Sequence, residues 1–210
     1  DEDTETVQDN DIEIEKYLTN KTTIETINIK DIPNISGIYI VECPVNFKIE
    51  FTDKPITIKE KVIKGKLRNL IYPVEELYEK YENGNKRILN IGKTNCKEGL
   101  QRRLQLYLEY GQGKDVAHRG GRSVWQIINN QKLNLYWYPT EKARELEKYL
   151  IQIHSQKYPA PLGKDKHFGY NFWKWANSRF KRQKDIFTEE ETQKIKNSIS
   201  VIKDAINKVY

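Results

Sequence analysis

The sequence predicts an α/β protein of the α+β kind, in which a small mixed or antiparallel sheet of three strands is flanked by helices. Short runs rich in β-branched and aromatic residues, such as GIYIVEC and KLNLYWY, are typical of half-buried strands. Longer stretches with apolar side chains every three or four positions are typical of amphipathic helices. Strands and helices alternate without internal repeats, and this favours one mixed sheet with an insertion and a C-terminal helix.

The first half of the chain contributes two of the predicted strands. Several segments can be assigned in order: a short helix near 12–18, a strand over 37–43, further extended pieces in NFKIEF and ITIKEKVI, a helix over 74–81, a turn at 83–85 and a strand over 87–91. A helix over 99–110 follows, in which apolar residues recur at helical spacing.

The second half contributes one strand and the clearest helices. HRGGRSVWQII predicts a loop that continues as a helix, KLNLYWY a strand, and EKARELEKYLIQIHSQ an amphipathic helix. Near the C-terminus Thr188 and Glu191 have the spacing of a capping box. The helix that follows carries one apolar stripe, made of Ile195, Ile199, Ile202, Ile206 and Val209.

Composition bounds the domain organisation. The 210 residues predict an acidic, disordered leader (1–16), one domain (17–165) with an insertion at 44–86, and a basic aromatic segment with a C-terminal helix packed on that domain (166–210). No apolar run reaches membrane-spanning length, no secretory signal is visible, and two cysteines are too few for a disulfide framework or a zinc site. We therefore expect a cytoplasmic protein with no membrane partner. Because the chain contains no methionine, we also expect it to be trimmed or incomplete.

The charge is unevenly distributed. Residues 1–16 carry eight acidic groups and one lysine, a net −7, which leaves +13 on the remainder of a chain whose net charge is +6. A basic surface attracts nucleic acid by neutralising phosphates, although a lysine-rich soluble surface gives the same total.

A Gly-Lys-Thr at 92–94 follows the strand over 87–91 and suggests a phosphate-binding P-loop. The first glycine of that motif would have to stand at position 87, which is arginine. The spacing therefore excludes a nucleoside triphosphatase, and the glycine indicates instead that the strand breaks at this point.

Two helices place a charged residue beside their apolar stripe. At about 100° per residue, Arg103 and Tyr107 lie at the edge of the stripe formed by Leu100 and Leu104, while Arg102 points to solvent. On the later helix Glu147 flanks the stripe and Glu145 lies on the far side. A carboxylate can hold Mg²⁺, an arginine can stabilise phosphate charge, and tyrosine hydroxyls can handle protons. These are the parts of a phosphodiesterase.

The residues that carry this chemistry resemble a known signature. Gly37-Ile38-Tyr39 and Asn90-Ile91-Gly92-Lys93 are similar to the two halves of the motif of the GIY-YIG nuclease superfamily, and Arg103, Glu147 and KYPAPLG follow in the family's order. The resemblance spans about residues 33 to 165. HRGGRSVWQ is similar to the H-x-G-G-R-x-x-W-Q run of one bacterial branch.

The resemblance implies a DNA endonuclease that uses one Mg²⁺ or Mn²⁺ ion and leaves a 5′-phosphate. It implies that Glu147 binds the metal, that Arg103 neutralises charge on the phosphate, and that Tyr39 acts on the attacking water with Lys93 or Tyr107; His118 is a further catalytic candidate. Cleavage of both strands would require a homodimer or two binding events. Repair, defence against foreign DNA and mobile-element cutting all remain open.

The chain departs from the family at two positions. Asn90 replaces the second tyrosine, and the family asparagine has Lys164 and Asn171 as its nearest counterparts. The alternative function is therefore a DNA-binding module that has kept the scaffold and lost catalysis. The insertion could touch DNA or support the sheet.

Two stretches suggest contact with double-stranded, distorted or single-stranded DNA. Basic residues surround Gly120-Gly121, where backbone can approach a phosphate, and a later segment (164–184) mixes lysine and arginine with aromatic rings. For Phe172 and Trp175, packing of the last helix onto the domain is favoured over contact with DNA. The candidate nucleic-acid contacts are Lys114, Arg119, Arg122, Lys164, Lys166, Trp173, Lys174 and Arg179.

Overall fold

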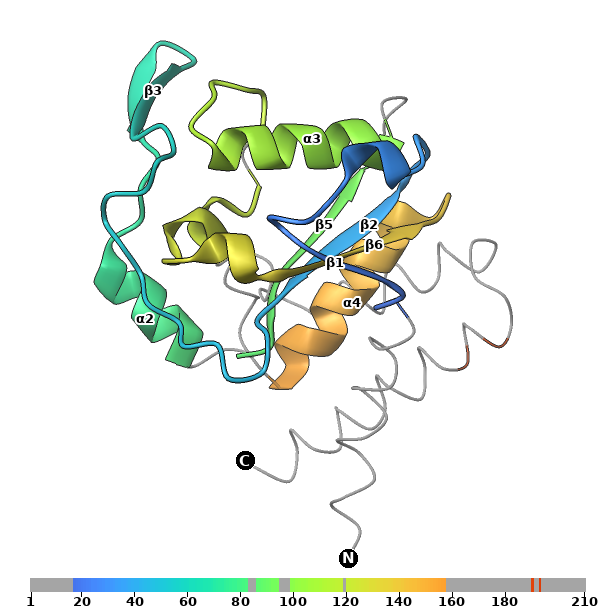
Figure 1. Cartoon of the computed structure of the whole chain (residues 1–210). Coiled ribbons are helices and arrows are strands. Elements are labelled where there is room, and N and C mark those ends of the chain that lie inside the picture. The colour runs from blue at the N-terminus through green and yellow to red at the C-terminus, as the bar shows by residue number, and fades with distance from the viewer. Residues whose placement is uncertain are drawn as a thin grey trace, which may run out of the picture.

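A four-stranded antiparallel sheet forms the centre of the fold (Figure 1). In the computed structural model we describe residues 17–82, 86–94, 99–118, 120–157, 190 and 193. The strand order is β1-β6-β2-β5, with the bounds β1 Asn20–Thr23, β2 Gly37–Glu42, β5 Ile88–Thr94 and β6 Asn134–Pro139. The predicted α+β class with an antiparallel sheet is confirmed, and the sheet has one strand more than the three expected.

Strand β1 is the additional strand. It pairs with β6 from Asn20 opposite Trp137 to Thr23 opposite Asn134. Its sequence NKTT has no apolar alternation, so nothing local distinguishes it from a loop. The pairing with β6 supplies the backbone partners that make it a strand.

Two helices cover opposite faces of the sheet (Figure 1). Helix α3 (Gly99–Gly111) packs Leu100 and Leu104 against the β2 face that carries Tyr39 and Val41. Helix α4 (Ala143–Lys157) packs on the other face, with Leu146 and Leu150 beside the β2 residues Ile38 and Ile40. Both helices were predicted from their apolar periodicity, and α2 (Val74–Glu82) also lies where the sequence places it.

Three local predictions are corrected. Gly92-Lys93-Thr94 does not break the strand, since β5 continues to Thr94, which pairs with Gly37. NFKIEF forms no strand, and only an isolated bridge joins Phe51 to Ile127. The helix expected in HRGGRSVWQII is a short 3₁₀ helix, η2 (Arg122–Gln126). Two further 3₁₀ turns occur in the described residues, η1 (Ile29–Asp31) and η3 (Asn130–Lys132).

The insertion at 44–86 is attached to η2 and the residues that follow it. The backbone N–H of Thr52 donates to Gln126 O at 2.8 Å, and Ile128 N–H donates to Glu50 O at the same distance. The Gln126 side chain donates to the carbonyls of Thr52 and Tyr72 and accepts from the Tyr72 N–H. Part of the insertion thus supports the fold, while the hairpin β3 (Glu60–Ile63) and β4 (Lys66–Asn69) extends from it (Figure 1).

Several predictions fall outside the described residues. These are the leader over 1–16, the turn at 83–85, the segment 166–210 apart from positions 190 and 193, and the C-terminal capping box and stripe. Of the helix expected near 12–18, only Tyr17 and Leu18 are described, and neither is helical. Among the described residues, none of the helices combines the length and apolar character needed to cross a membrane.

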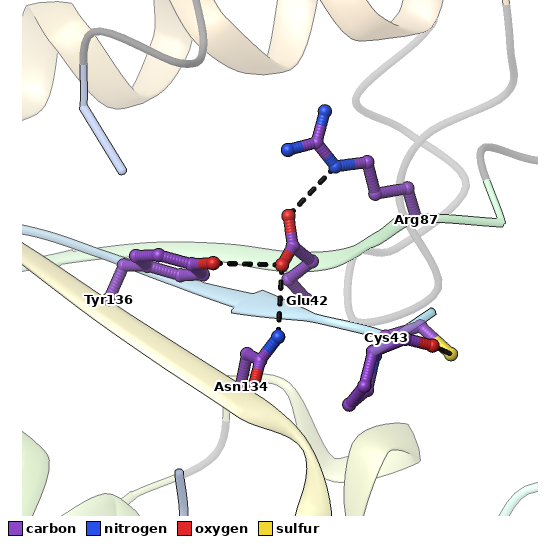
Figure 2. A network of polar contacts seen from close by, with 6 residues as sticks. Glu42, Cys43, Arg87, Asn134 and Tyr136 are labelled. Carbon is purple, nitrogen blue, oxygen red and sulfur yellow. Dashed lines mark hydrogen bonds and ion pairs between the residues drawn. The ribbon is translucent and has the colours of Figure 1, made fainter. Parts of the chain in front are cut away.

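A buried carboxylate joins β2, β6 and the residue that precedes β5 at one end of the sheet. The register shifts between Val41 and Glu42, so Leu89 is the extra residue of a β-bulge. Figure 2 shows three donors around Glu42: Arg87 Nε donates to Oε2 at 2.8 Å, and Tyr136 Oη and Asn134 Nδ2 donate to Oε1 at 2.9 and 3.1 Å. A buried carboxylate with this many partners is satisfied rather than strained.

We predict that Glu42→Ala lowers the free energy of unfolding by about 2 kcal/mol, because the buried donors of Tyr136 and Asn134 lose their shared acceptor. Urea unfolding followed by far-UV circular dichroism measures the change. Glu42→Gln keeps an oxygen acceptor and should cost less. A Glu42→Ala variant as stable as the wild type would show that this network contributes nothing.

Candidate functional site

The site is centred on the Tyr39 ring, which lies across a glycine of the neighbouring strand. Tyr39 on β2 is opposite Gly92 on β5. A Cβ atom at Gly92 would lie 2.1 Å from Cζ and 2.4 Å from the hydroxyl oxygen of Tyr39. Position 92 must therefore lack a side chain, and the ring extends from β2 over β5, the last strand in the order. This brings the hydroxyl toward the edge of the sheet.

Arg103 approaches this hydroxyl from α3. Leu100, Leu104 and Tyr107 are fully buried on the same helix, and their packing fixes which way Arg103 points. Its Nη2 lies 3.7 Å from where a Cβ at Gly120 would stand. Hydrogen bonding and positive charge from Arg103 both lower the pKa of Tyr39. Arg103 is thus held beside Tyr39, as its place on the helix predicted.

Glu147 and Lys93 approach from the opposite face. Glu147, on α4, is 5% exposed, and its Oε2 lies 3.9 Å from Lys93 Nζ. Lys93 pairs with Ile38, a residue of the α4 face. The negative charge of Glu147 raises the pKa of Tyr39, so its carboxylate acts on the same hydroxyl as Arg103. Side chains from both faces therefore act on one phenol beside β5.

Burial keeps both tyrosines of the site protonated. Burial raises the pKa of Tyr39 to about 12, with Glu147 adding to the shift and Arg103 opposing it. Burial also raises the pKa of Tyr107 well above its ordinary value. Both hydroxyls therefore keep their proton at neutral pH. A phenol in this state can donate a hydrogen bond and orient a reactant, and it is a poor proton acceptor.

Asn90 occupies a closed position beside Tyr107. It is 1% exposed, and Gly121 has a φ of 70°. A Cβ at Gly121 would lie 2.5 Å from Asn90 Nδ2 and 3.2 Å from the Tyr107 hydroxyl. Neither amide atom of Asn90 makes a hydrogen bond of standard geometry within the described part of the chain. A tyrosine at position 90 would not fit here unless Gly121 and Tyr107 moved.

Tyr107 and His118 join this position to the next loop. The Tyr107 ring centroid lies 5.4 Å from that of Tyr39, 4.9 Å from that of His118 and 4.8 Å from that of Trp125. His118 is fully buried, and its Nε2 lies 3.0 Å from Gly120 O. The structure therefore places His118 where it supports the loop that carries Gly120 and Gly121.

Glu147 is the carboxylate of this site that could hold a divalent ion. No group of three or more His, Cys, Asp and Glu side chains with the spacing of a metal site occurs among the described residues. Mg²⁺ commonly uses one or two protein carboxylates and takes its other ligands from water and substrate phosphate. Glu147 fits that pattern, with Lys93 as a nearby positive charge that also suits a phosphate.

The residues expected to contact nucleic acid lie in different surroundings in the structure. Lys114 is exposed, and its Nζ lies 3.6 Å from Glu109 Oε1. Arg122 is half-buried: its Nη2 donates to Tyr72 Oη at 3.2 Å, and its guanidinium lies over the Tyr72 ring. Arg122 thus contacts the insertion through Tyr72 and stabilises its attachment to the domain. The remaining candidates, and Asn171, lie outside the described residues: Arg119, Lys164, Lys166, Trp173, Lys174 and Arg179.

Sequence reasoning missed three residues that shape the site. Trp125 and Gln126 were quoted only as part of a motif, and Gly121 only as a place where backbone can approach a phosphate. Gly121 lies against Asn90, Trp125 packs at a tilt against Tyr107, and Gln126 hydrogen-bonds to the insertion. The close spacing of glycine, tryptophan and glutamine after His118 is the signal that could have indicated a packed loop.

Comparisons with protein-family models, with curated proteins and with solved structures find no match. The resemblance to GIY-YIG nucleases therefore stays a prediction from the motifs.

We predict that Gly92→Ala disturbs the site while Gly120→Ala does not. The new Cβ at position 92 would overlap the Tyr39 ring and displace it, at a cost of about 1–3 kcal/mol in stability. At position 120 the nearest described atom is Arg103 Nη2 at 3.7 Å, an ordinary contact. Thermal unfolding compares the two variants. Equal stability of both would contradict the placement of Tyr39 over Gly92.

We also predict that Tyr39 makes the protein lose stability at alkaline pH. Since its pKa is about 12 in the folded state and about 10 in the unfolded chain, its contribution is full below pH 10 and is lost as the pH rises toward 12. Between pH 9 and pH 11 this amounts to about 1.3 kcal/mol. Urea unfolding at both pH values should show a smaller loss in Tyr39→Phe than in the wild type. Identical losses would mean that Tyr39 is not buried as described.

Proposed function

We propose that the chain is a DNA endonuclease that hydrolyses phosphodiester bonds with the help of Mg²⁺ or Mn²⁺. The observation that carries the proposal is that Arg103 and Glu147, from helices on opposite faces of the sheet, both act on the pKa of Tyr39, and that Glu147 lies 3.9 Å from Lys93, the residue next to Gly92 on β5. Charged side chains at the edge of a core need a reason to be there, since most charges on amphipathic helices are at the surface. Phosphate hydrolysis would account for both charges, since the arginine would bind the phosphate and the glutamate would hold the metal ion.

Arg103 is the group that would neutralise charge on the phosphate. Its guanidinium is held by the packing of α3 and faces the Tyr39 hydroxyl and Gly120. Its Nε is buried and makes no hydrogen bond with the described residues, so an unsatisfied donor lies within the site. A fixed arginine stabilises the charge that develops in the transition state without having to reorganise.

Glu147 is the group that would hold the divalent ion. The ion, when bound, would polarise a non-bridging phosphate oxygen and stabilise the charge of the leaving oxygen. Lys93, 3.9 Å from the carboxylate, would hold the phosphate on the same side of β5. The positive charges of Arg103 and Lys93 would thus contact the substrate from both faces of the strand.

Tyr39 would orient the attacking water as a hydrogen-bond partner. Its raised pKa disfavours the alternative in which Tyr39 or Tyr107 takes the proton from that water. The proton would then have to leave by way of solvent or the substrate phosphate. Tyr107 is further from this role, because its hydroxyl lies beside Asn90 and Gly121.

The second candidate function is a DNA-binding module without catalysis. Asn90 favours it, because a tyrosine expected from the nuclease resemblance is absent and the surrounding residues leave no room for one. The retained pair of Arg103 and Glu147 favours the enzyme, since a binding module has no need to keep a carboxylate beside Lys93. Repair, defence and mobile-element cutting are equally compatible with the enzyme, and so is a homodimer that acts on both strands.

We predict that the purified chain nicks supercoiled plasmid in the presence of Mg²⁺ or Mn²⁺ and not in EDTA. Glu147→Gln and Arg103→Gln should each reduce the rate at least about 100-fold, the usual cost of removing one group that stabilises transition-state charge. Agarose-gel conversion of supercoiled to open-circular DNA measures the rate.

Matched controls come from the same helices. Arg102→Gln and Glu145→Gln change the same residue types on faces turned away from Tyr39, and they should keep wild-type activity. A wild type that binds duplex and single-stranded DNA yet cuts neither would replace the nuclease with the binding module.

A further inference from the structure

The hairpin β3–β4 is a regular ribbon that packs little of itself on the body of the protein. Its strands pair from Glu60 opposite Asn69 to Ile63 opposite Lys66. Lys64 and Gly65 connect them with φ values of 51° and 73°, as a two-residue hairpin turn requires. A Cβ at Gly65 would meet nothing within 4 Å, so the turn lies in open space.

Positive charge dominates the ribbon. Between residues 59 and 68 it carries five basic side chains and one acidic side chain, that of Glu60. Since side chains alternate between the two faces, Lys61, Lys66 and Arg68 lie on one face with Ile63. Lys64 adds a fourth charge at the turn, and Lys59 a fifth at the base. This is a phosphate-binding composition on a surface of about ten residues.

The opposite face exposes an apolar pair. Val62 and Leu67 are direct cross-strand partners, yet they are 63% and 65% exposed. None of residues 60–69 is buried. An isolated two-stranded ribbon is only marginally stable in water. This apolar pair, which lies side by side among charged residues, offers a ligand surface to bury.

The base of the ribbon is firmly attached to the protein. Leu70 is buried, and its N–H donates to Lys59 O at 2.7 Å. Lys61 makes an ion pair with Asp115, in the loop that follows α3. That loop continues to His118 and Gly120, the latter beside Arg103. The ribbon and the candidate site are therefore joined through one short segment of chain.

We propose that the β3–β4 hairpin is a ribbon that binds duplex DNA outside the catalytic site, and this inference rests on the proposed function. Its cations contact phosphates along a groove, and Val62 and Leu67 lie against sugars and base edges. The major groove, about 12 Å wide, admits a two-stranded β-ribbon. A protein partner is disfavoured, because protein interfaces bury about 800 Å² per partner and their centres are depleted of charge.

The test measures binding of a fluorescent duplex of about 25 base pairs by anisotropy, without divalent metal, over a range of salt concentrations. The variant is Lys64→Gln/Lys66→Gln/Arg68→Gln. The control is Lys21→Gln/Lys30→Gln/Lys132→Gln, which removes three exposed charges from other parts of the surface. The slope of log K against log salt is negative, and each lost phosphate contact reduces its magnitude by about 0.9.

We expect the hairpin variant to reduce the magnitude of the slope by about 2–3 and to weaken binding at least about 10-fold, while the control reduces that magnitude by less than about 1. Val62→Ser/Leu67→Ser should weaken binding and leave the slope unchanged. If the hairpin and control variants behave alike while the wild type binds and cuts DNA, the inference is overturned and the proposed function stands. A wild type that neither binds nor cuts DNA overturns both.

Discussion

The contact between the Tyr39 ring and the bare backbone of Gly92 is the constraint on which the site depends. Because position 92 has no side chain, the phenol can extend over β5 instead of ending above its own strand. The hydroxyl is then within reach of charges from both faces of the sheet, Arg103 from α3 and Glu147 from α4. Helices on opposite faces of a sheet are separated by the sheet itself and by the side chains on both of its faces, so such a shared group has to lie near an edge.

Loop and insertion residues stabilise this arrangement from the side of α3. Tyr107 packs between Tyr39, His118 and Trp125, and Gly121 closes the space around Asn90. Gln126 then fastens the insertion to the same segment through its carboxamide. A satisfied side-chain amide of this kind gives specificity at little cost, because none of its hydrogen-bonding groups is left unpaired.

The helices and the central strands could be predicted from sequence because their signals are local. Leu100 and Leu104, like Leu146 and Leu150, recur at helical spacing, and the same spacing placed Arg103 and Glu147 beside the core. Strand β1 and the continuation of β5 through Gly92 could not be predicted, since the first depends on pairing with β6 and the second on a ring from β2. The direction of the Tyr39 pKa shift likewise depends on burial, which a sequence does not display.

The position of β5 at one end of the strand order limits how copies of the chain can associate. A second molecule that extended the sheet by adding a strand to β5 would place backbone against the edge reached by the Tyr39 hydroxyl. Such a pair would be closed to any substrate that must reach Arg103 and Glu147. The edge formed by β1, four residues long and polar, is on the far side of the sheet and has no such conflict. An assembly in which both copies stay accessible therefore leaves β5 uncovered.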